Sequence, residues 1–159
     1  MCSSDLIRVS KNLPLIFPVH PRTKKNLENW GLLEKLDKCQ NIKLEEPLSY
    51  IKFMSLIFDC GLVITDSGGI QEETSYLGIP CFTLRENTER PITVTLGSNR
   101  LCTTLDVEAQ VSKVLSRPKS TTKIPLWDGC TKSRVVTSIR KFLQIADQHQ
   151  IVGQSFDVG

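Results

Sequence analysis

The sequence predicts an α/β fold built on a doubly wound parallel sheet with helices on both faces. Short β-rich runs alternate with longer helical patterns along the chain, which is the order of elements in a sheet wound through βαβ units. The run 61–65 is apolar up to its last residue, as a strand that is covered on both faces requires. A length of 159 residues without an internal boundary corresponds to one domain of common size.

The first third of the chain predicts two strands separated by a helix. Residues 13–19 form an apolar run with prolines near its edges, and 41–44 form a shorter strand candidate. Residues 21–30 make a charged helical segment between them, and Gly31 stands where a helix C-terminus favours a left-handed residue.

A second helix is expected to begin near Pro47. Four positions recur at helical spacing on one face of it, and we expect that face to be buried. These positions are Leu48, Ile51, Ser55 and Phe58.

The centre of the chain predicts a strand, a turn, a helix and two more strands. The run 61–65 leads through a Gly-rich turn into a helix over 70–77, which Gly78 is expected to end. Residues 80–84 and 98–102 are the next strand candidates.

The remaining third predicts two amphipathic helices, at 107–115 and 135–146. Residues 116–125 are rich in Ser, Thr, Lys and Pro and are expected to form an exposed loop. We expect one domain over 1–147, followed by a frayed tail at 148–159.

Composition and charge argue against two classes of protein, nucleic-acid binders and membrane-spanning proteins. A net charge of +3 is too small and too scattered for a nucleic-acid binder. No run approaches the ~18 apolar residues of a membrane-spanning helix, and the first residues lack the basic and apolar segments of a secretory signal. We therefore expect a cytoplasmic protein that binds neither nucleic acid nor membrane.

The cysteines are expected to be buried thiols in successive β/α units. No two of them form a C-x-x-C pair, and the chain has only two histidines, so a metal site is not expected. Free thiols fit a reducing cytoplasm. The six are Cys2, Cys39, Cys60, Cys81, Cys102 and Cys130.

The turn after the strand at 61–65 is the best candidate for a ligand site. In open α/β sheets, ligands bind beyond the carboxyl ends of the strands. Ser67 suits an N-cap, and Gly68 and Gly69 let a phosphate approach the free N–H groups of the next helix. The same residues also suit a simple tight turn with a cap, so spacing alone leaves both interpretations open.

A family resemblance decides between them. Residues 66–91, DSGGIQEETSYLGIPCFTLRENTERP, resemble the signature segment of the non-hydrolysing UDP-N-acetylglucosamine 2-epimerases. The segments FPVHPR at 17–22 and EPLSY at 46–50 resemble further family motifs, as does LWDG at 126–129 with Arg134. The resemblance covers about residues 13 to 143.

The resemblance implies a Rossmann-like domain, the C-terminal half of a glycosyltransferase-B-like two-domain fold. The chain is expected to lack the first strand of this domain, with residues 1–12 as part of its first helix. The acid/base residues of the family lie in the N-terminal domain, so the resemblance implies no catalytic residue in this chain.

The resemblance also implies a UDP site. Ser67, Gly68 and Gly69 would contact the diphosphate, Glu73 the ribose hydroxyls, and Arg90 the phosphates. The uracil would lie against backbone groups of Leu48 and the ring of Phe53. His20 is a weaker candidate, for a phosphate or a regulatory nucleotide.

The implied reaction interconverts UDP-N-acetylglucosamine and UDP-N-acetylmannosamine by elimination and re-addition of UDP, without metal or redox cofactor. The expected partners are UDP, a UDP-2-acetamido sugar, the missing N-terminal domain and, as family members often dimerise, a second copy. We expect the isolated chain to bind UDP weakly at best and not to epimerise. Two alternatives stay open: the donor domain of a UDP-sugar glycosyltransferase, and a non-catalytic nucleotide-binding module.

Overall fold

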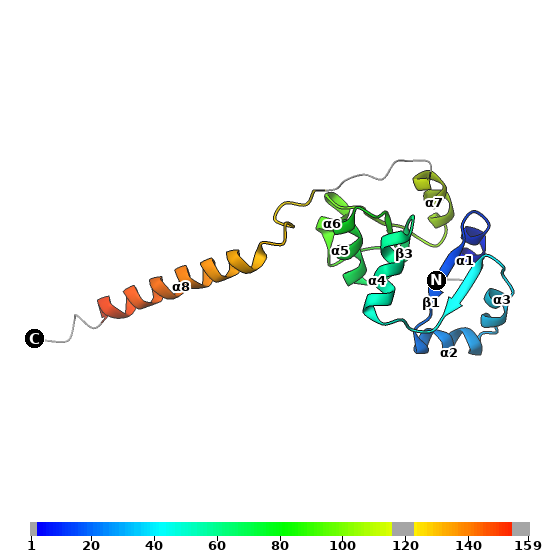
Figure 1. Cartoon of the computed structure of the whole chain (residues 1–159), viewed down its shortest axis with the longest axis horizontal. Coiled ribbons are helices and arrows are strands. Elements are labelled where there is room, and N and C mark those ends of the chain that lie inside the picture. Colours follow the sequence, from blue (N-terminus) through cyan, green and yellow to red (C-terminus); the bar gives the residue numbers. More distant parts are fainter. Residues whose placement is uncertain (1–2, 116–122, 154–159) are drawn as a thin grey trace, which may run out of the picture. The chain divides into compact units, whose positions relative to one another are not determined.

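A computed structural model describes residues 3–115 and 123–153 of the chain (Figure 1). The chain divides into two compact units, Met1–Thr122 and Lys123–Gly159. The first unit holds all five described strands and the candidate site. The second holds one long helix, α8 (Thr131–Gly153), and the turn before it.

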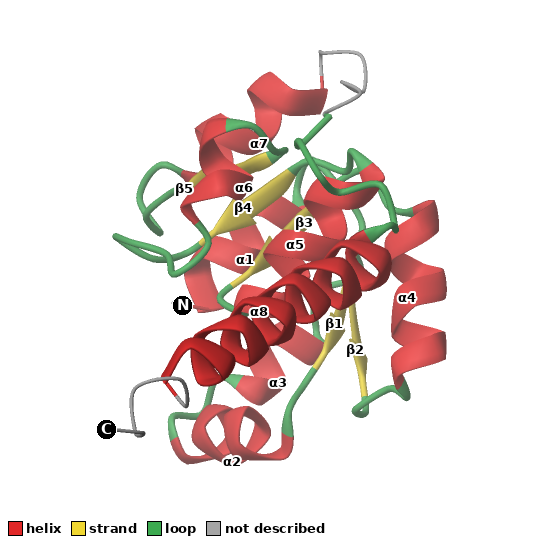
Figure 2. Ribbon diagram, turned by 90° about the vertical axis from the view of Figure 1, so that its left-hand side faces the viewer, coloured by secondary structure: helices red, strands yellow, loops and turns green. Residues whose placement is uncertain are grey.

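The α/β class with parallel pairing is confirmed, and the strands divide between two sheets (Figure 2). Strands β1 (Leu15–Pro18) and β2 (Ile42–Glu45) form a parallel pair. Strands β3 (Val63–Thr65), β4 (Cys81–Thr83) and β5 (Asn99–Leu101) form a parallel three-stranded sheet in that order. Four of these strands lie within a predicted run, and β2 extends one residue beyond the run predicted at 41–44.

Seven helices in residues 3–115, the described part of the first unit, connect and cover these strands, and one of them lies within the partial helix expected at 1–12. They are α1 (Ser3–Ser10), α2 (Pro21–Asn29), α3 (Leu33–Asp37), α4 (Tyr50–Asp59), α5 (Gly68–Leu77), α6 (Pro91–Thr95) and α7 (Val107–Leu115). Gly31 and Gly78 adopt left-handed φ values of +62° and +69° after α2 and α5, as predicted. The sequence did not indicate α3 and α6, because five residues are too few for a helical period to show.

The predicted buried face of α4 is wrong. Ile51 is 77% exposed and Phe58 is 59% exposed, whereas Ile57 is buried and Phe53 is half-buried. The helix begins at Tyr50, so Leu48 precedes it. The segment 50–59 carries apolar side chains on two faces, and packing in the fold, which periodicity cannot see, selects the face with Phe53 and Ile57.

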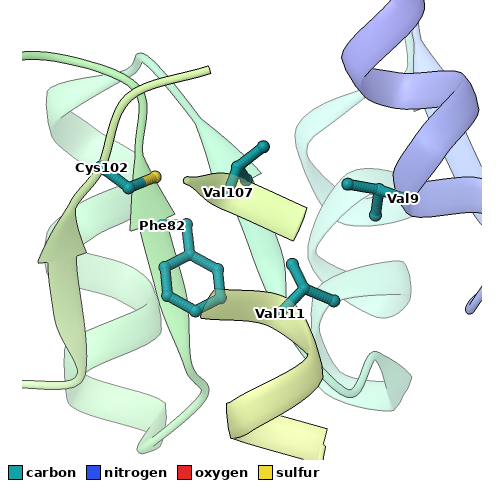
Figure 3. Packing of buried hydrophobic residues seen from close by; sticks show 5 residues of the cluster. All are labelled: Val9, Phe82, Cys102, Val107 and Val111. Atoms are coloured by element: carbon teal, nitrogen blue, oxygen red, sulfur yellow. The ribbon is translucent and has the colours of Figure 1, made fainter. Parts of the chain in front are cut away.

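Helices cover both faces of the three-stranded sheet. Neighbouring residues of a strand point to opposite faces, so Phe82 and Cys81 of β4 face different layers. Phe82 packs with Val107 and Val111 of α7, and Val9 of α1 points towards Val111 (Figure 3). Cys81 lies on the α5 side, where it contacts Thr74.

A second apolar cluster lies around the β1–β2 pair and is formed by Val19, Leu27, Leu36 and Ile42. Leu6 and Ile7 of α1 pack against this cluster, while Val9 of the same helix belongs to the first one. Helix α1 therefore contributes side chains to both cores.

The turn before α8 is held by an ion pair between Asp128 and Arg134. Arg134 donates from Nη1 to Asp128 Oδ1 at 2.8 Å, and from Nη2 to Oδ2. These hydrogen bonds hold the pKa of Asp128 well below its usual range.

The loop predicted at 116–125 and the tail predicted at 148–159 are only partly described. Residues 123–125 and 148–153 belong to the described part, whereas 116–122 and 154–159 lie outside the described residues. The domain boundary at 147 remains a prediction. Within 3–115 and 123–153, no helix is long and apolar enough to cross a membrane.

The prediction of buried thiols holds for only two of the described cysteines. Cys81 is fully buried and Cys102 is 4% exposed, but Cys39 and Cys60 are half-buried and Cys130 is exposed. Cys130 lies in the turn before α8, outside any β/α unit, which explains the error. Cys2 lies outside the described residues.

Alkylation is expected to separate these cysteines by rate. Burial raises the pKa of Cys81 to about 11, so about one in a thousand of its thiols is ionised at pH 8, in addition to being shielded. Treatment of the native chain with iodoacetamide at pH 8, followed by peptide mass spectrometry, should label Cys130 first and leave Cys81 and Cys102 unmodified. In urea all three should react, and native labelling of Cys81 as fast as Cys130 would contradict the burial.

Candidate functional site

The candidate site begins where β3 passes into α5. β3 ends at Thr65 and α5 begins at Gly68, with Ser67 at the N-cap position in an extended conformation. The predicted position of the cap is correct, but the Ser67 hydroxyl makes no capping hydrogen bond to the helix. Instead, the Ser67 N–H donates to Thr65 Oγ1 at 3.0 Å. The first N–H groups of α5 therefore have no side-chain cap from Ser67, and the positive end of the helix dipole can act on an anion.

The two glycines of this turn are not required by backbone conformation. Neither Gly68 nor Gly69 has a positive φ. A Cβ on Gly69 would meet nothing within 4 Å, and a Cβ on Gly68 would lie 3.7 Å from Glu89 Oε2, an ordinary contact. The fold would thus accept alanine at both positions. Their smallness leaves open space at the N-terminus of α5, which fits the close approach of a ligand.

Arg90 is held against the same helix. It occupies the N-cap position of α6, and its Nε lies 2.8 Å from Glu72 Oε1 on α5. The Arg90 and Glu72 side chains are 41% and 44% exposed, so Arg90 is partly accessible to solvent, although its Nε is buried. A planar, permanently charged fork of this kind suits bidentate recognition of phosphate.

Glu73 has one carboxylate oxygen engaged and one buried without a partner. Tyr50 Oη donates to Glu73 Oε1 at 3.0 Å, and this bond raises the pKa of Tyr50. Oε2 is inaccessible to solvent and accepts no hydrogen bond from any described residue. A buried acceptor without a donor is rare in native proteins and calls for an explanation. A ligand hydroxyl would supply one after a movement of the Glu73 side chain that exposes Oε2.

The Tyr50–Glu73 bond joins the two sheets at the site. Tyr50 begins α4, which follows β2, and Glu73 lies on α5, which follows β3. Leu48 and Phe53, both half-buried, flank Tyr50 in the chain. Sequence analysis assigned Tyr50 no role, and its signals there were its place in the EPLSY segment at 46–50 and next to predicted site residues.

His20 lies at the carboxyl end of β1 and is exposed. It is the N-cap residue of α2, and its Nδ1 accepts a hydrogen bond from the Arg22 N–H at 3.3 Å. Because Nδ1 is an acceptor, the neutral ring carries its proton on Nε2. No group of three or more His, Cys, Asp or Glu side chains among the described residues could hold a metal ion.

Comparison with known proteins identifies relatives of this chain. The sequence model of the family described as UDP-N-acetylglucosamine 2-epimerase matches residues 3–140. UDP-N-acetylglucosamine 2-epimerase from Methanococcus maripaludis is 53% identical over 87 residues, covering 55% of this chain and 24% of the relative. The same enzyme from Methanocaldococcus jannaschii is 41% identical over 123 residues, covering 77% of this chain and 34% of the relative. The chain thus spans about a quarter to a third of the length of these curated relatives.

Solved structures give the same result. The crystal structure of the M. jannaschii UDP-GlcNAc 2-epimerase in complex with UDP-GlcNAc and UDP matches with a TM-score of 0.75 and 37% identity, over 87% of this chain and 39% of that one. The enzyme from Neisseria meningitidis bound to UDP-GlcNAc matches with a TM-score of 0.68 and 27% identity, over 87% and 40% of the two chains.

Proposed function

This chain belongs to the UDP-N-acetylglucosamine 2-epimerase family, and from that membership we propose that its first unit holds the UDP part of a UDP-2-acetamido sugar. The protein that contains it would interconvert UDP-N-acetylglucosamine and UDP-N-acetylmannosamine. The observation that carries the proposal is that the first two turns of α5 gather an open N-terminus and a buried, unpaired carboxylate oxygen.

The diphosphate would bind at the start of α5. The N–H groups at Gly68 and Gly69 and the Ser67 hydroxyl, which makes no capping bond, would donate to its oxygens, and the helix dipole would favour its negative charge. Arg90 would add a second, permanent positive charge from the side. Glu72 Oε1 lies 2.8 Å from Arg90 Nε, so the ligand would share Arg90 with Glu72 or displace it.

The nucleoside would lie between α4 and α5. A movement of the Glu73 side chain, which Tyr50 holds at Oε1, would expose Oε2 to accept a ribose hydroxyl. The uracil would contact backbone groups at Leu48 and the ring of Phe53, on the segment that Tyr50 ties to Glu73. His20 would offer its Nε2–H to a phosphate or to a second nucleotide.

The reaction would proceed by elimination and re-addition. A base removes the proton at C2 of the sugar while the bond between C1 and the diphosphate oxygen breaks, leaving a C1=C2 double bond and UDP. Re-addition of UDP, with a proton delivered to the other face of C2, inverts that centre. In this chain α5 and Arg90 would stabilise the departing diphosphate and retain it for return.

The base is not among the proposed site residues of this chain. We propose that it belongs to an N-terminal domain, since the relatives are about three to four times as long as the matched region. The isolated chain should then bind UDP weakly at best and not epimerise a UDP-2-acetamido sugar. Formation of UDP-N-acetylmannosamine by the purified 159-residue chain would contradict this division.

Replacement of Gly69 by alanine tests the phosphate site. The added Cβ meets nothing in the fold, so we expect stability to be retained or to rise by up to about 1 kcal/mol. UDP binding should weaken about tenfold or more, because the methyl group lies in the path of the phosphate and blocks hydrogen bonds to a charged group. Isothermal titration calorimetry with UDP measures the dissociation constant.

Gly61→Ala is the matched control, because a Cβ there also meets nothing within 4 Å and Gly61 precedes β3 rather than following it. It should leave UDP binding unchanged. Equal UDP affinity in the wild type and Gly69→Ala would exclude diphosphate binding at this turn. A folded wild type that binds no UDP would favour a module with another ligand.

We further propose that the protein works in the cytoplasm. The five described cysteines form no disulfide with one another, and thiols persist in a reducing compartment. A second copy of the chain is proposed as a partner on family grounds alone.

A further inference from the structure

Gln71 is the polar side chain at the centre of a buried network. It lies on α5, one residue before the Glu72 that pairs with Arg90, and it is fully buried. Burying an amide is unfavourable unless its polar atoms are hydrogen-bonded. Gln71 belongs to the sequence segment that carries the family resemblance, but none of the site roles proposed above uses it.

The side-chain carbonyl oxygen of Gln71, Oε1, accepts two hydrogen bonds. Thr88 Oγ1 donates to Gln71 Oε1 at 2.6 Å, and Asn99 Nδ2 donates to the same oxygen at 3.1 Å. Asn99, 2% exposed on β5, also donates to Thr93 Oγ1 at 3.0 Å. Its own carbonyl oxygen accepts from Thr83 Oγ1 at 2.7 Å. One side chain of α5 is therefore linked to β4, β5, α6 and the loop before α6.

Both arms of this network end on the backbone of Arg90. The Arg90 N–H donates to Thr88 Oγ1 at 2.9 Å. The Arg90 carbonyl accepts from Thr93 Oγ1 at 2.7 Å and from the Thr93 N–H at 3.0 Å. The hydrogen bonds thus close a ring that runs from Gln71 through Thr88 to Arg90, and back through Thr93 and Asn99. The packing around it is tight, because a Cβ on Gly97 would collide with the Thr93 carbonyl.

We propose that Gln71 is a positioning residue that fixes Arg90 relative to the N-terminus of α5. The role rests on the proposed function, in which these two features bind the same diphosphate. Gln71 lies on α5 itself. The ring therefore holds Arg90 at a fixed position relative to the N-terminal N–H groups of α5, which would face the ligand. A group held in place before binding loses less conformational freedom when the ligand arrives.

Two substitutions interrupt the ring at different points. Gln71→Met keeps an unbranched side chain of similar size and removes the acceptor oxygen. It also removes Nε2, a buried nitrogen with no partner among the described residues, so the loss of stability is partly offset. Thr88→Val keeps the shape of a half-buried loop residue and removes the hydroxyl between Gln71 and Arg90. Thr95→Val is the matched control, because Thr95 is exposed on α6 and bonds only to the carbonyl of Pro91.

UDP and uridine are titrated by calorimetry into the purified chain and its variants. Gln71→Met and Thr88→Val should each weaken UDP binding about five- to tenfold. They should leave uridine binding unchanged, because uridine lacks the phosphates that Arg90 faces. In the Arg90→Ala background, Gln71→Met should have no further effect on UDP. Equal losses for UDP and uridine, or losses that add to that of Arg90→Ala, would show a merely structural role and overturn the proposal.

A measurement without ligand separates this proposal from the proposed function. In ¹H–¹⁵N spectra, the Arg90 Nε–H signal and the exchange protection of its backbone N–H report how Arg90 is held. Both should change in Gln71→Met and Thr88→Val and stay as in the wild type in Thr95→Val. Unchanged signals would overturn the positioning role whatever UDP does, whereas a wild type that binds no UDP would overturn the UDP site.

Discussion

Replacement of Glu73 by alanine is expected to weaken UDP binding about 10- to 100-fold, since a hydrogen bond to a charged group contributes about 1.5–3 kcal/mol. Glu73 Oε2 is buried and accepts no hydrogen bond from the described residues, so the ribose hydroxyl would be its donor. Stability should fall little, because the substitution also removes a carboxylate oxygen that the fold leaves unpaired. Calorimetric titration with UDP gives the change in affinity, and thermal unfolding followed by circular dichroism gives the change in stability.

Two further variants complete this test. Glu34→Ala removes an exposed glutamate on α3, which pairs only with Lys38 at 3.6 Å, and should leave UDP binding unchanged. Tyr50→Phe removes the bond that holds Oε1 and should weaken UDP binding less than Glu73→Ala does. Wild-type affinity in folded Glu73→Ala would exclude a ribose contact at this carboxylate.

Replacement of Phe82 by alanine should have the largest effect on stability. Phe82 is 1% exposed at the centre of the cluster it forms with Val9, Val107 and Val111, and Phe→Ala changes in cores typically lower stability by about 3–5 kcal/mol. A domain of this size is stable by about 5–15 kcal/mol in total, so the variant should be near the limit of folding. Urea unfolding followed by circular dichroism measures the difference in free energy.

The matched control for this substitution is Phe58→Ala on α4. Phe58 is 59% exposed, so its removal leaves no internal cavity, and stability should change by less than about 0.5 kcal/mol. Equal unfolding midpoints for Phe82→Ala and the wild type would show that Phe82 does not lie in the core.

Most of the fold could be predicted because local patterns determine it. Strands β1, β3 and β4 lie in short apolar runs, and the left-handed glycines after α2 and α5 mark the ends of both helices. The wrong face of α4 shows where local patterns fail. Residues 50–59 are apolar on both sides, and only the packing of the folded chain distinguishes them.

The residues of the candidate site also divide into those that could be predicted from the sequence and those that could not. The turn at Ser67 could be found because a strand end, two glycines and a helix start are adjacent in the sequence. The roles of Tyr50 and Gln71 could not be predicted, because these roles depend on partners that lie far away in the sequence. Tyr50 bonds to Glu73, 23 residues away, and Gln71 bonds to Asn99, 28 residues away. Nothing in the local sequence of either residue specifies such a contact.

The dual packing of α1 has a consequence for cooperativity. The β1–β2 pair and the β3–β4–β5 sheet share no ladder of hydrogen bonds. Within eight residues, α1 supplies Val9 to one core and Leu6 and Ile7 to the other. Cores this small are marginal when they stand alone. Helix α1 is thus one of the links between the two halves of the first unit, together with Leu15 of β1 and the Tyr50–Glu73 bond, and fraying of this terminal helix would make their unfolding less cooperative.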